Sequence, residues 1–230
     1  MKVSSILLMT FVFMAASADD HVTKSLFDGS SLDAWDFGEG AWEIDEEGAL
    51  TCNMQEVEDK NGKKKLKGMG YIWTKQQYGD FELTLSYKLS EGANSGVFYR
   101  AERDNPVNGG HEIQLMDNEG FQRAHGPKDG KKLHGSFYEG KEASSNPANP
   151  VGEWDTLKLR AKGSKITCHI NSVEVFNVDV NDWPEPGKNP DGTANKFKVA
   201  IKDKPMRGSI GLQNHGQYVW FKDIKITTLK

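Results

Sequence analysis

The sequence predicts an all-β fold, organised as a single sandwich or jelly-roll domain. About a dozen short apolar segments are separated by turn signals. The 24 glycines supply many of those turns, and no stretch has the period of a long helix. A chain of 230 residues is long enough for one such domain, and we find no repeat or linker that would divide it.

Residues Met1–Ala18 have the pattern of a secretory signal peptide. Lys2 provides the positive start, an apolar run follows from Ile6 to Ala16, and Ala16-Ser17-Ala18 fits the small-x-small cleavage rule. The apolar run is short for a bilayer span, and no cysteine stands at the cleavage point. We therefore expect a periplasmic or secreted protein without a stable membrane anchor, with a mature domain that covers residues 19–230.

The composition narrows the function classes. The net charge of -4 gives no basic face of the kind that nucleic acids require, so we expect no nucleic-acid partner. The mature chain keeps two cysteines, Cys52 and Cys168. Export permits a disulfide between them, but two separate buried thiols fit the pattern equally well.

The first half of the chain predicts strands and hairpins in series. Lysines fill Lys60–Lys67 without interleaved aromatic residues, which favours a solvated hairpin tip over a binding patch for an acidic ligand. Phe81–Ser90 has the clearest alternation of apolar and polar residues, and Ser95–Ala101 is expected to return beside it as a hairpin partner. The remaining strands are predicted within Ser25–Trp35, Trp42–Ile44, Ala49–Met54 and Tyr71–Thr74.

The second half begins with a long loop and ends with paired strands. Glu119–Pro150 is unusually long for a connection, as functional loops often are. The phase of apolar residues shifts inside the last strand and predicts a β-bulge there. The strands are predicted at Glu153–Ala161, Lys165–Ile170, Val173–Val180, Gly208–Gly216 and Tyr218–Leu229.

The stretch Gly110–Asn118 is the best candidate for chemistry. Ile113 and Leu115 alternate with Glu112 and Gln114, and the alternation slips at Met116. A bulge at Met116 would return Asp117 to the face of Glu112 and Gln114. Carboxylates beside apolar strand residues must be solvated, paired or bound to a metal. An ordinary solvated strand face is the alternative.

Several segments in order resemble the 3-keto-disaccharide hydrolase family. They are Leu26-Phe27-Asp28-Gly29 with Leu32 and Trp35, Tyr78-Gly79-Asp80-Phe81-Glu82-Leu83, Asn94-Ser95-Gly96-Val97-Phe98-Tyr99-Arg100, Glu112–Asn118, Gly152-Glu153-Trp154-Asp155 and Gly208–Gly216. The resemblance covers nearly the whole mature chain. It implies a concanavalin A-like jelly-roll sandwich and activity on oxidised disaccharides or glycosides. Asn214 stands where the family more usually has Asp, so it cannot supply that negative charge.

A ketone at carbon-3 of a sugar acidifies the hydrogen at carbon-2, so the expected site needs a base and groups that stabilise an enolate. We expect His215 as base or metal ligand, and Glu112 and Asp117 as oxygen ligands for Ca²⁺ or Mn²⁺. No organic cofactor is expected. Candidate substrate-binding residues are Arg100, Gln114, Gln213, Asn214, His134 and Tyr138. A salt bridge to Glu112 is the alternative role for Arg100.

Three other functions compete with this hypothesis. A conventional glycosidase would need two carboxyls about 5 Å apart, and the frame Glu112-x-Gln114-x-x-Asp117 has an amide at its centre. A carbohydrate-binding module would need the amides and aromatic residues but not His215 or a metal. An adhesion or structural sandwich would show no dependence on sugars.

Overall fold

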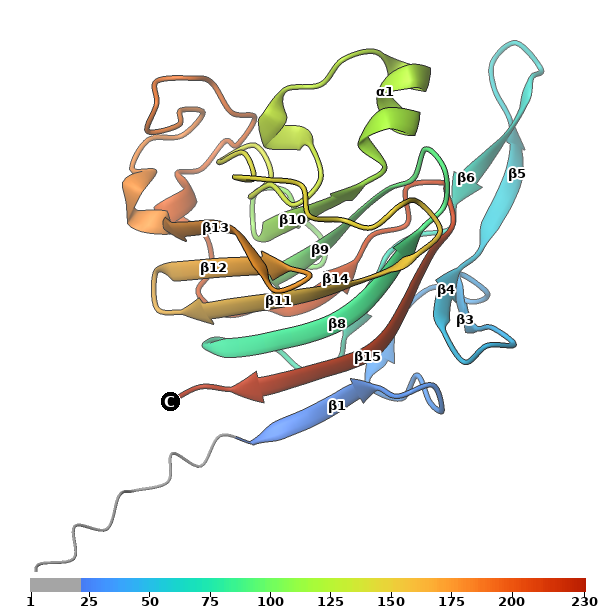
Figure 1. Cartoon of the computed structure of the whole chain (residues 1–230), viewed down its shortest axis with the longest axis horizontal. Coiled ribbons are helices and arrows are strands. Elements are labelled where there is room, and N and C mark those ends of the chain that lie inside the picture. Colours follow the sequence, from blue (N-terminus) through green and yellow to red (C-terminus); the bar gives the residue numbers. More distant parts are fainter. Residues whose placement is uncertain (1–21) are drawn as a thin grey trace, which may run out of the picture.

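The computed structural model describes residues 22–230, so the predicted signal peptide Met1–Ala18 lies outside the described residues. Two antiparallel sheets pack against each other around one core (Figure 1). This arrangement confirms the predicted all-β, single-domain, concanavalin A-like sandwich. Among the described residues, no helix is long and apolar enough to cross a membrane.

The larger sheet has eight strands, and its order is β13-β12-β11-β8-β15-β4-β3, with β1 also paired to β15. β8 lies near its middle and alternates strictly between buried and half-buried residues, which confirms the strand predicted at Phe81–Ser90. The register of β15 shifts between Lys222 and Lys225, which confirms the predicted bulge. The strands are β1 (Thr23–Phe27), β3 (Trp42–Ile44), β4 (Leu50–Cys52), β8 (Phe81–Leu89), β11 (Trp154–Lys162), β12 (Lys165–Ile170), β13 (Val173–Asp179) and β15 (Val219–Thr228).

The smaller sheet has five strands in the order β10-β9-β14-β7-β2. The predicted hairpin between Phe81–Ser90 and Ser95–Ala101 is wrong, because β8 and β9 belong to different sheets. The turn after β8 carries the chain across the core, where Leu83 and Val97 both lie. The strands are β2 (Trp35–Asp36), β7 (Ile72–Thr74), β9 (Asn94–Ala101), β10 (His111–Met116) and β14 (Ser209–Leu212).

The lysine-rich segment forms a separate exposed hairpin of β5 (Met54–Glu58) and β6 (Lys64–Gly68), which extends from the body of the sandwich (Figure 1). One short helix, α1 (Asn118–His125), was not predicted. Eight residues are too few for a clear helical period, and the helix depends on its cap. Three 3₁₀ turns complete the described structure: η1 (Gly130–Lys132), η2 (Val180–Asp182) and η3 (Ile201–Asp203).

The two cysteines lie in the core as separate thiols. Cys52 is on β4 and Cys168 is on β12, and both are free and fully buried. Burial raises the pKa of the Cys52 thiol to about 11 and that of the Cys168 thiol further. Both groups therefore act as small apolar core residues.

Candidate functional site

Strand β10 divides its side chains between the core and the outer face of the smaller sheet. Ile113 and Leu115 enter the core, whereas Glu112 and Gln114 point to the opposite face. β10 is the last strand of the sheet, but the chain near Tyr138 covers its edge. The Tyr138 amide donates to the Glu112 carbonyl at 3.0 Å, and the Gln114 amide donates to Ser136 at 3.1 Å. This contact brings Tyr138 beside the outer face.

Glu112 is a buried carboxyl on that outer face. Glu112 as a whole residue is 8% exposed. The Gln213 side-chain amide donates to Glu112 Oε1 at 3.2 Å and to the Tyr71 hydroxyl at 3.1 Å. Burial raises the pKa of Glu112 to about 8, while the charges of Lys196 and Lys204 and the bond from Gln213 partly oppose the rise.

A glycine provides the space for this carboxyl. Gly96 on β9 lies under Glu112, and a Cβ at position 96 would collide with Glu112 Oε1. Gly211 on β14 has the same role for Trp73, whose ring occupies the space of a side chain at 211. Glycine weakens a strand interior, so two glycines at these positions indicate close packing on the outer face.

Two lysines supply positive charge near Glu112. Lys204 is 3% exposed, and its ammonium donates to the carbonyls of Gly110 at 2.7 Å and Val107 at 2.9 Å. Burial lowers the pKa of Lys204 to about 7, and the charge of Glu112 opposes that fall. Lys196 donates to the Tyr138 hydroxyl at 3.2 Å.

Aromatic rings complete the face. Tyr71 stacks on Phe98 with 5.6 Å between ring centroids, and Trp73 packs against both at 5.9 Å and 5.8 Å. Burial raises the pKa of Tyr138 to about 12, so its hydroxyl keeps its proton at neutral pH. The face therefore combines a proton acceptor, proton donors, cations and an apolar floor.

The predicted bulge at Met116 is wrong, and Asp117 does not share the face of Glu112. β10 pairs regularly with β9 through Met116 and then ends. Asp117 is the N-cap of α1: its carboxylate accepts from the Gly120 amide at 3.2 Å and from the Gly92 amide at 2.7 Å. The slip in the sequence pattern marks the start of a helix, and Asp is a preferred N-cap residue.

Arg100 lies away from Glu112. It is fully buried and donates to Asp80 at 2.9 Å and to the carbonyls of Gly79 and Gly163 at 2.9 Å and 2.8 Å. Neither of the roles predicted for Arg100, substrate contact or a salt bridge to Glu112, fits this position. A guanidinium with several donors is suited to join two separate turns, here at residues 79–80 and at Gly163.

His134 is held within the protein against Tyr87. Its Nδ1 accepts from the Met116 amide at 3.0 Å, and its Nε2 lies 2.9 Å from the Tyr87 hydroxyl. Burial lowers the pKa of His134 to about 4, so the ring is neutral at pH 7. These bonds hold the segment after β10 in place, so His134 does not serve as a ligand-binding group on the outer face.

Asn214 and His215 follow β14 beside the exposed hairpin. The Asn214 side chain donates to the Asn53 carbonyl at 2.8 Å and accepts from the Gly216 amide at 3.1 Å, so it fixes the loop. His215 is exposed on that loop. Across residues 22–230, no three His, Cys, Asp or Glu side chains gather where they could hold a metal ion. The residues present therefore do not fit the predicted Ca²⁺ or Mn²⁺ set of Glu112, Asp117 and His215.

The structure thus brings Glu112, Gln213 and Tyr138 together. Gln114 lies on the same strand face, and its amide donates to Asn94 at 2.7 Å. Sequence reasoning missed four contributors: Tyr71, Gly96, Lys196 and Lys204. Gly96 carried a signal, since an isolated glycine within a strand pattern marks a close approach. The lysines carried none, because 29 lysines and arginines are spread along the chain.

Comparisons with known proteins identify the family of this chain. The model of the 3-keto-α-glucoside-1,2-lyase-like domain matches residues 22–227. A 3-keto-disaccharide hydrolase of Bacteroides thetaiotaomicron is 26% identical over 244 residues, which cover 94% of this chain and 81% of that protein. A crystal structure from Parabacteroides distasonis, provisionally described as a glycosyl hydrolase, is 28% identical with a TM-score of 0.77, and the match covers 90% of this chain and 100% of the other.

A more distant structure shares the fold alone. The catalytic domain of a laminarinase from Thermotoga maritima is 12% identical with a TM-score of 0.54, and the match covers 91% of this chain and 97% of that domain. The family match is different in kind, because it extends over nearly all of the described residues. The chain therefore belongs to the 3-keto-α-glucoside-1,2-lyase-like family.

Proposed function

We propose that this protein cleaves 3-keto-glycosides and that Glu112 is the base that removes the proton from carbon-2 of the oxidised sugar. Its family makes it a carbohydrate-active enzyme of the hydrolase or lyase class. The observation that carries the proposal is the buried Glu112 carboxyl, whose pKa of about 8 suits proton transfer near neutral pH. A carboxyl with an ordinary pKa would be a far weaker base.

The reaction follows from the acidity of the substrate. Glu112 takes the proton from carbon-2, and the electron pair of that C–H bond moves toward the carbon-3 carbonyl to form an enolate. The enolate then expels the oxygen at carbon-1, which leaves with the second sugar and takes a proton. Addition of water across the resulting double bond gives the net hydrolysis product. No redox step occurs, so no electron acceptor is needed.

Groups near Glu112 suit the enolate stage. Negative charge moves from the carboxylate to the ketone oxygen, and fixed donors and cations reduce its energy. Tyr138 keeps its hydroxyl proton, and Lys196 donates to the same hydroxyl at 3.2 Å. Lys204 adds a second positive charge whose field already lowers the pKa of Glu112. Tyr71 and Trp73 offer apolar ring surface of the kind on which sugars stack.

The structure offers less to a conventional glycosidase. That mechanism needs a second carboxyl about 5 Å from the first in a retaining enzyme. In the frame predicted for it, Asp117 is occupied as the cap of α1.

We propose export by the Met1–Ala18 signal as well, so that the substrate would be met outside the cytoplasm.

The test is turnover of a 3-keto-glucoside beside its unoxidised parent, with wild type and Glu112→Gln. We expect cleavage of the keto sugar alone, a rate at least about 100-fold lower in the variant, and a primary isotope effect with deuterium at carbon-2. Equal cleavage of both sugars would refute the proposal and favour a glycosidase. Binding without turnover of either sugar would identify a binding module.

Addition of EDTA tests the predicted metal separately. Because the described residues do not gather three ligands, we expect turnover to be unchanged by chelation. Loss of turnover on chelation, restored by Ca²⁺ or Mn²⁺, would revive the metal hypothesis, while the role of Glu112 would still be judged by the rate of Glu112→Gln.

A further inference from the structure

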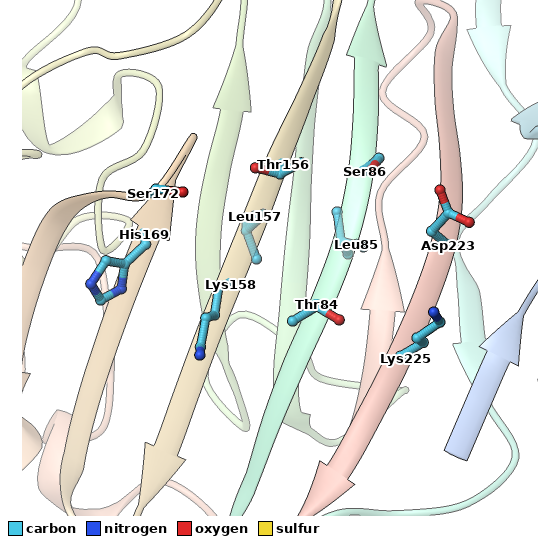
Figure 2. A pocket seen from close by; sticks show the side chains of 10 residues that line it. All are labelled: Thr84, Leu85, Ser86, Thr156, Leu157, Lys158, His169, Ser172, Asp223 and Lys225. Carbon is cyan, nitrogen blue, oxygen red and sulfur yellow. The ribbon is translucent and has the colours of Figure 1, made fainter. Parts of the chain in front are cut away.

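The exposed face of the larger sheet holds a trough that the proposed reaction does not use. It is a hollow of about 490 Å³ on the opposite side of the sandwich from Glu112. We call it the outer trough, and its lining residues are Thr84, Leu85, Ser86, Thr156, Leu157, Lys158, His169, Ser172, Asp223 and Lys225 (Figure 2).

The trough arises from side-chain size across neighbouring strands. Thr84 on the central strand β8 stands opposite Lys158 of β11 and Lys225 of β15. Figure 2 shows the short hydroxyl side chains of Thr84 and Ser86 between the longer groups of the two flanking strands. The bulge of β15 leaves Asp223 at φ 54 and displaces that strand from regular pairing. The floor is therefore rich in hydroxyls and the walls are charged.

Two more lysines are fixed beside the trough by aromatic rings. A cross-strand row joins Trp220, Lys88 and Trp154. The Lys88 ammonium lies 4.7 Å from the Trp220 ring centroid and 5.1 Å from that of Trp154. Lys222 lies 4.1 Å from the Trp154 centroid. Cation–π contacts of this kind hold ammonium groups in place without neutralising them.

Lysines and carboxylates both lie on this face. Lys88, Lys158, Lys222 and Lys225 gather here with Asp223 and Glu82, and Glu47 lies 3.9 Å from the Lys88 ammonium. Lys158 pairs with Glu82 at 3.0 Å. Within residues 22–230, Lys222 and Lys225 have no carboxylate at ion-pair distance. Lys222 and Lys225 keep their positive charge beside a hydroxyl-lined floor, which suits a ligand that carries both hydroxyls and negative charges.

We propose that the outer trough binds an acidic oligosaccharide. The hydroxyls of the oligosaccharide would exchange hydrogen bonds with Thr84, Ser86 and Thr156. The carboxylates of the oligosaccharide would pair with Lys225 and Lys158. Such a site would hold the enzyme on an acidic glycan while the opposite face carries out the reaction. The inference rests on the trough and its charges and not on the proposed catalytic role of Glu112.

The experiment measures binding of the purified full-length protein to oligogalacturonate, to a neutral glucan oligomer of the same length and to a short DNA duplex. Titration calorimetry at low salt and in 0.5 M NaCl supplies the affinities. Lys158→Gln/Lys225→Gln removes charge from the trough, and Thr84→Tyr fills it without changing the charge. Lys60→Gln/Lys63→Gln on the exposed hairpin is the matched control.

We expect wild type to bind oligogalacturonate best, with affinity at least about tenfold lower in both trough variants and unchanged in the control. Circular dichroism spectra and thermal unfolding should match wild type in all variants and confirm that they fold, whether or not a keto-glycoside is cleaved. The inference fails if wild type does not bind the acidic sugar or prefers the neutral one. It also fails if Thr84→Tyr binds normally, or if DNA binds equally well, since charge alone would then explain the binding.

Discussion

Replacement of Glu112 by Gln is expected to stabilise this protein while it removes activity. Gln keeps the size of Glu and can still accept the bond that Gln213 donates at 3.2 Å. It lacks the charge that burial makes expensive in the folded state. The loss of activity and the gain in stability have one cause, because the desolvation that makes Glu112 a better base also destabilises its ionised form.

The size of the gain depends on pH. The pKa of Glu112 rises from 4.5 in an ordinary carboxyl to about 8 in the folded protein. Below pH 4.5 both folded and unfolded states are protonated, and the carboxyl costs nothing. As pH rises toward 8, the unfolded state loses the proton that the folded state retains, and stability falls by about 1.4 kcal/mol per pH unit. At pH 7 this cost reaches about 3 kcal/mol, which Glu112→Gln would recover.

Urea unfolding at pH 4.5 and at pH 7 measures the effect. We expect the variant and wild type to have similar free energies of unfolding at pH 4.5 and to differ by up to about 3 kcal/mol at pH 7. Glu82→Gln is the matched control: Glu82 lies on the opposite sheet and pairs with Lys158, so its loss should cost at most about 1 kcal/mol. A Glu112→Gln variant that is no more stable at pH 7 than at pH 4.5, relative to wild type, would refute the reasoning.

Three further substitutions test other parts of the structure. Gly96→Ala should lower turnover at least about tenfold with the fold intact by circular dichroism, because its methyl group collides with Glu112 Oε1; wild-type turnover would contradict this packing. Lys204→Met removes a charge that lowers the pKa of Glu112, so the rise of turnover with pH should move to higher pH. An unchanged pH profile of turnover would show that Lys204 does not affect the pKa of Glu112. Within the part of the chain that the structure describes, neither ring nitrogen of the buried His111 has a hydrogen-bond partner. Burial holds its pKa well below 6.5, so only the unfolded state gains its proton just below that pH. His111→Phe should therefore raise thermal stability more at pH 5 than at pH 8, and an equal change at both would show that His111 is not the acid-sensitive group.

The fold was predictable because its signals are local and repeated. The alternation of Phe81–Leu89 needs nothing beyond the period of a strand. The same period cannot say which sheet a strand joins, and the turn after β8 therefore looked like a hairpin. The partners of β9 are β10 and β14, and the choice depends on long-range packing that no local pattern records.

The site was predictable in part. Glu112 and Gln213 each lie in a strand motif where polar residues interrupt an apolar pattern. Asp117 was placed wrongly because a slip of period has two causes, a bulge or the start of a helix, and a helix of eight residues is too short to distinguish them. Lys204 could not be predicted from the sequence, because the carbonyls to which its ammonium donates lie almost a hundred residues earlier in the chain.

The outer face of the smaller sheet departs from what stability alone would favour. A carboxyl is buried where its charge is costly, a lysine is buried to 3% exposure, and glycines stand inside two neighbouring strands. Each feature weakens the sheet by itself, yet Gly96 lies against Glu112 and the charge of Lys204 acts on it, while Gly211 makes room for Trp73 on the same face. In the larger sheet β8 alternates regularly, with Phe81 and Leu83 in the core and half-buried polar residues outside. That sheet also buries a carboxyl, Asp155 on β11, but Asp155 accepts from the Asn149 amide at 2.8 Å and from the Asn171 side chain at 2.5 Å, as a structural carboxylate does. Sequences tend to break the ordinary preferences where function requires it. This contrast between two sheets of one sandwich is the physical reason to place the reaction at Glu112 rather than on the opposite face.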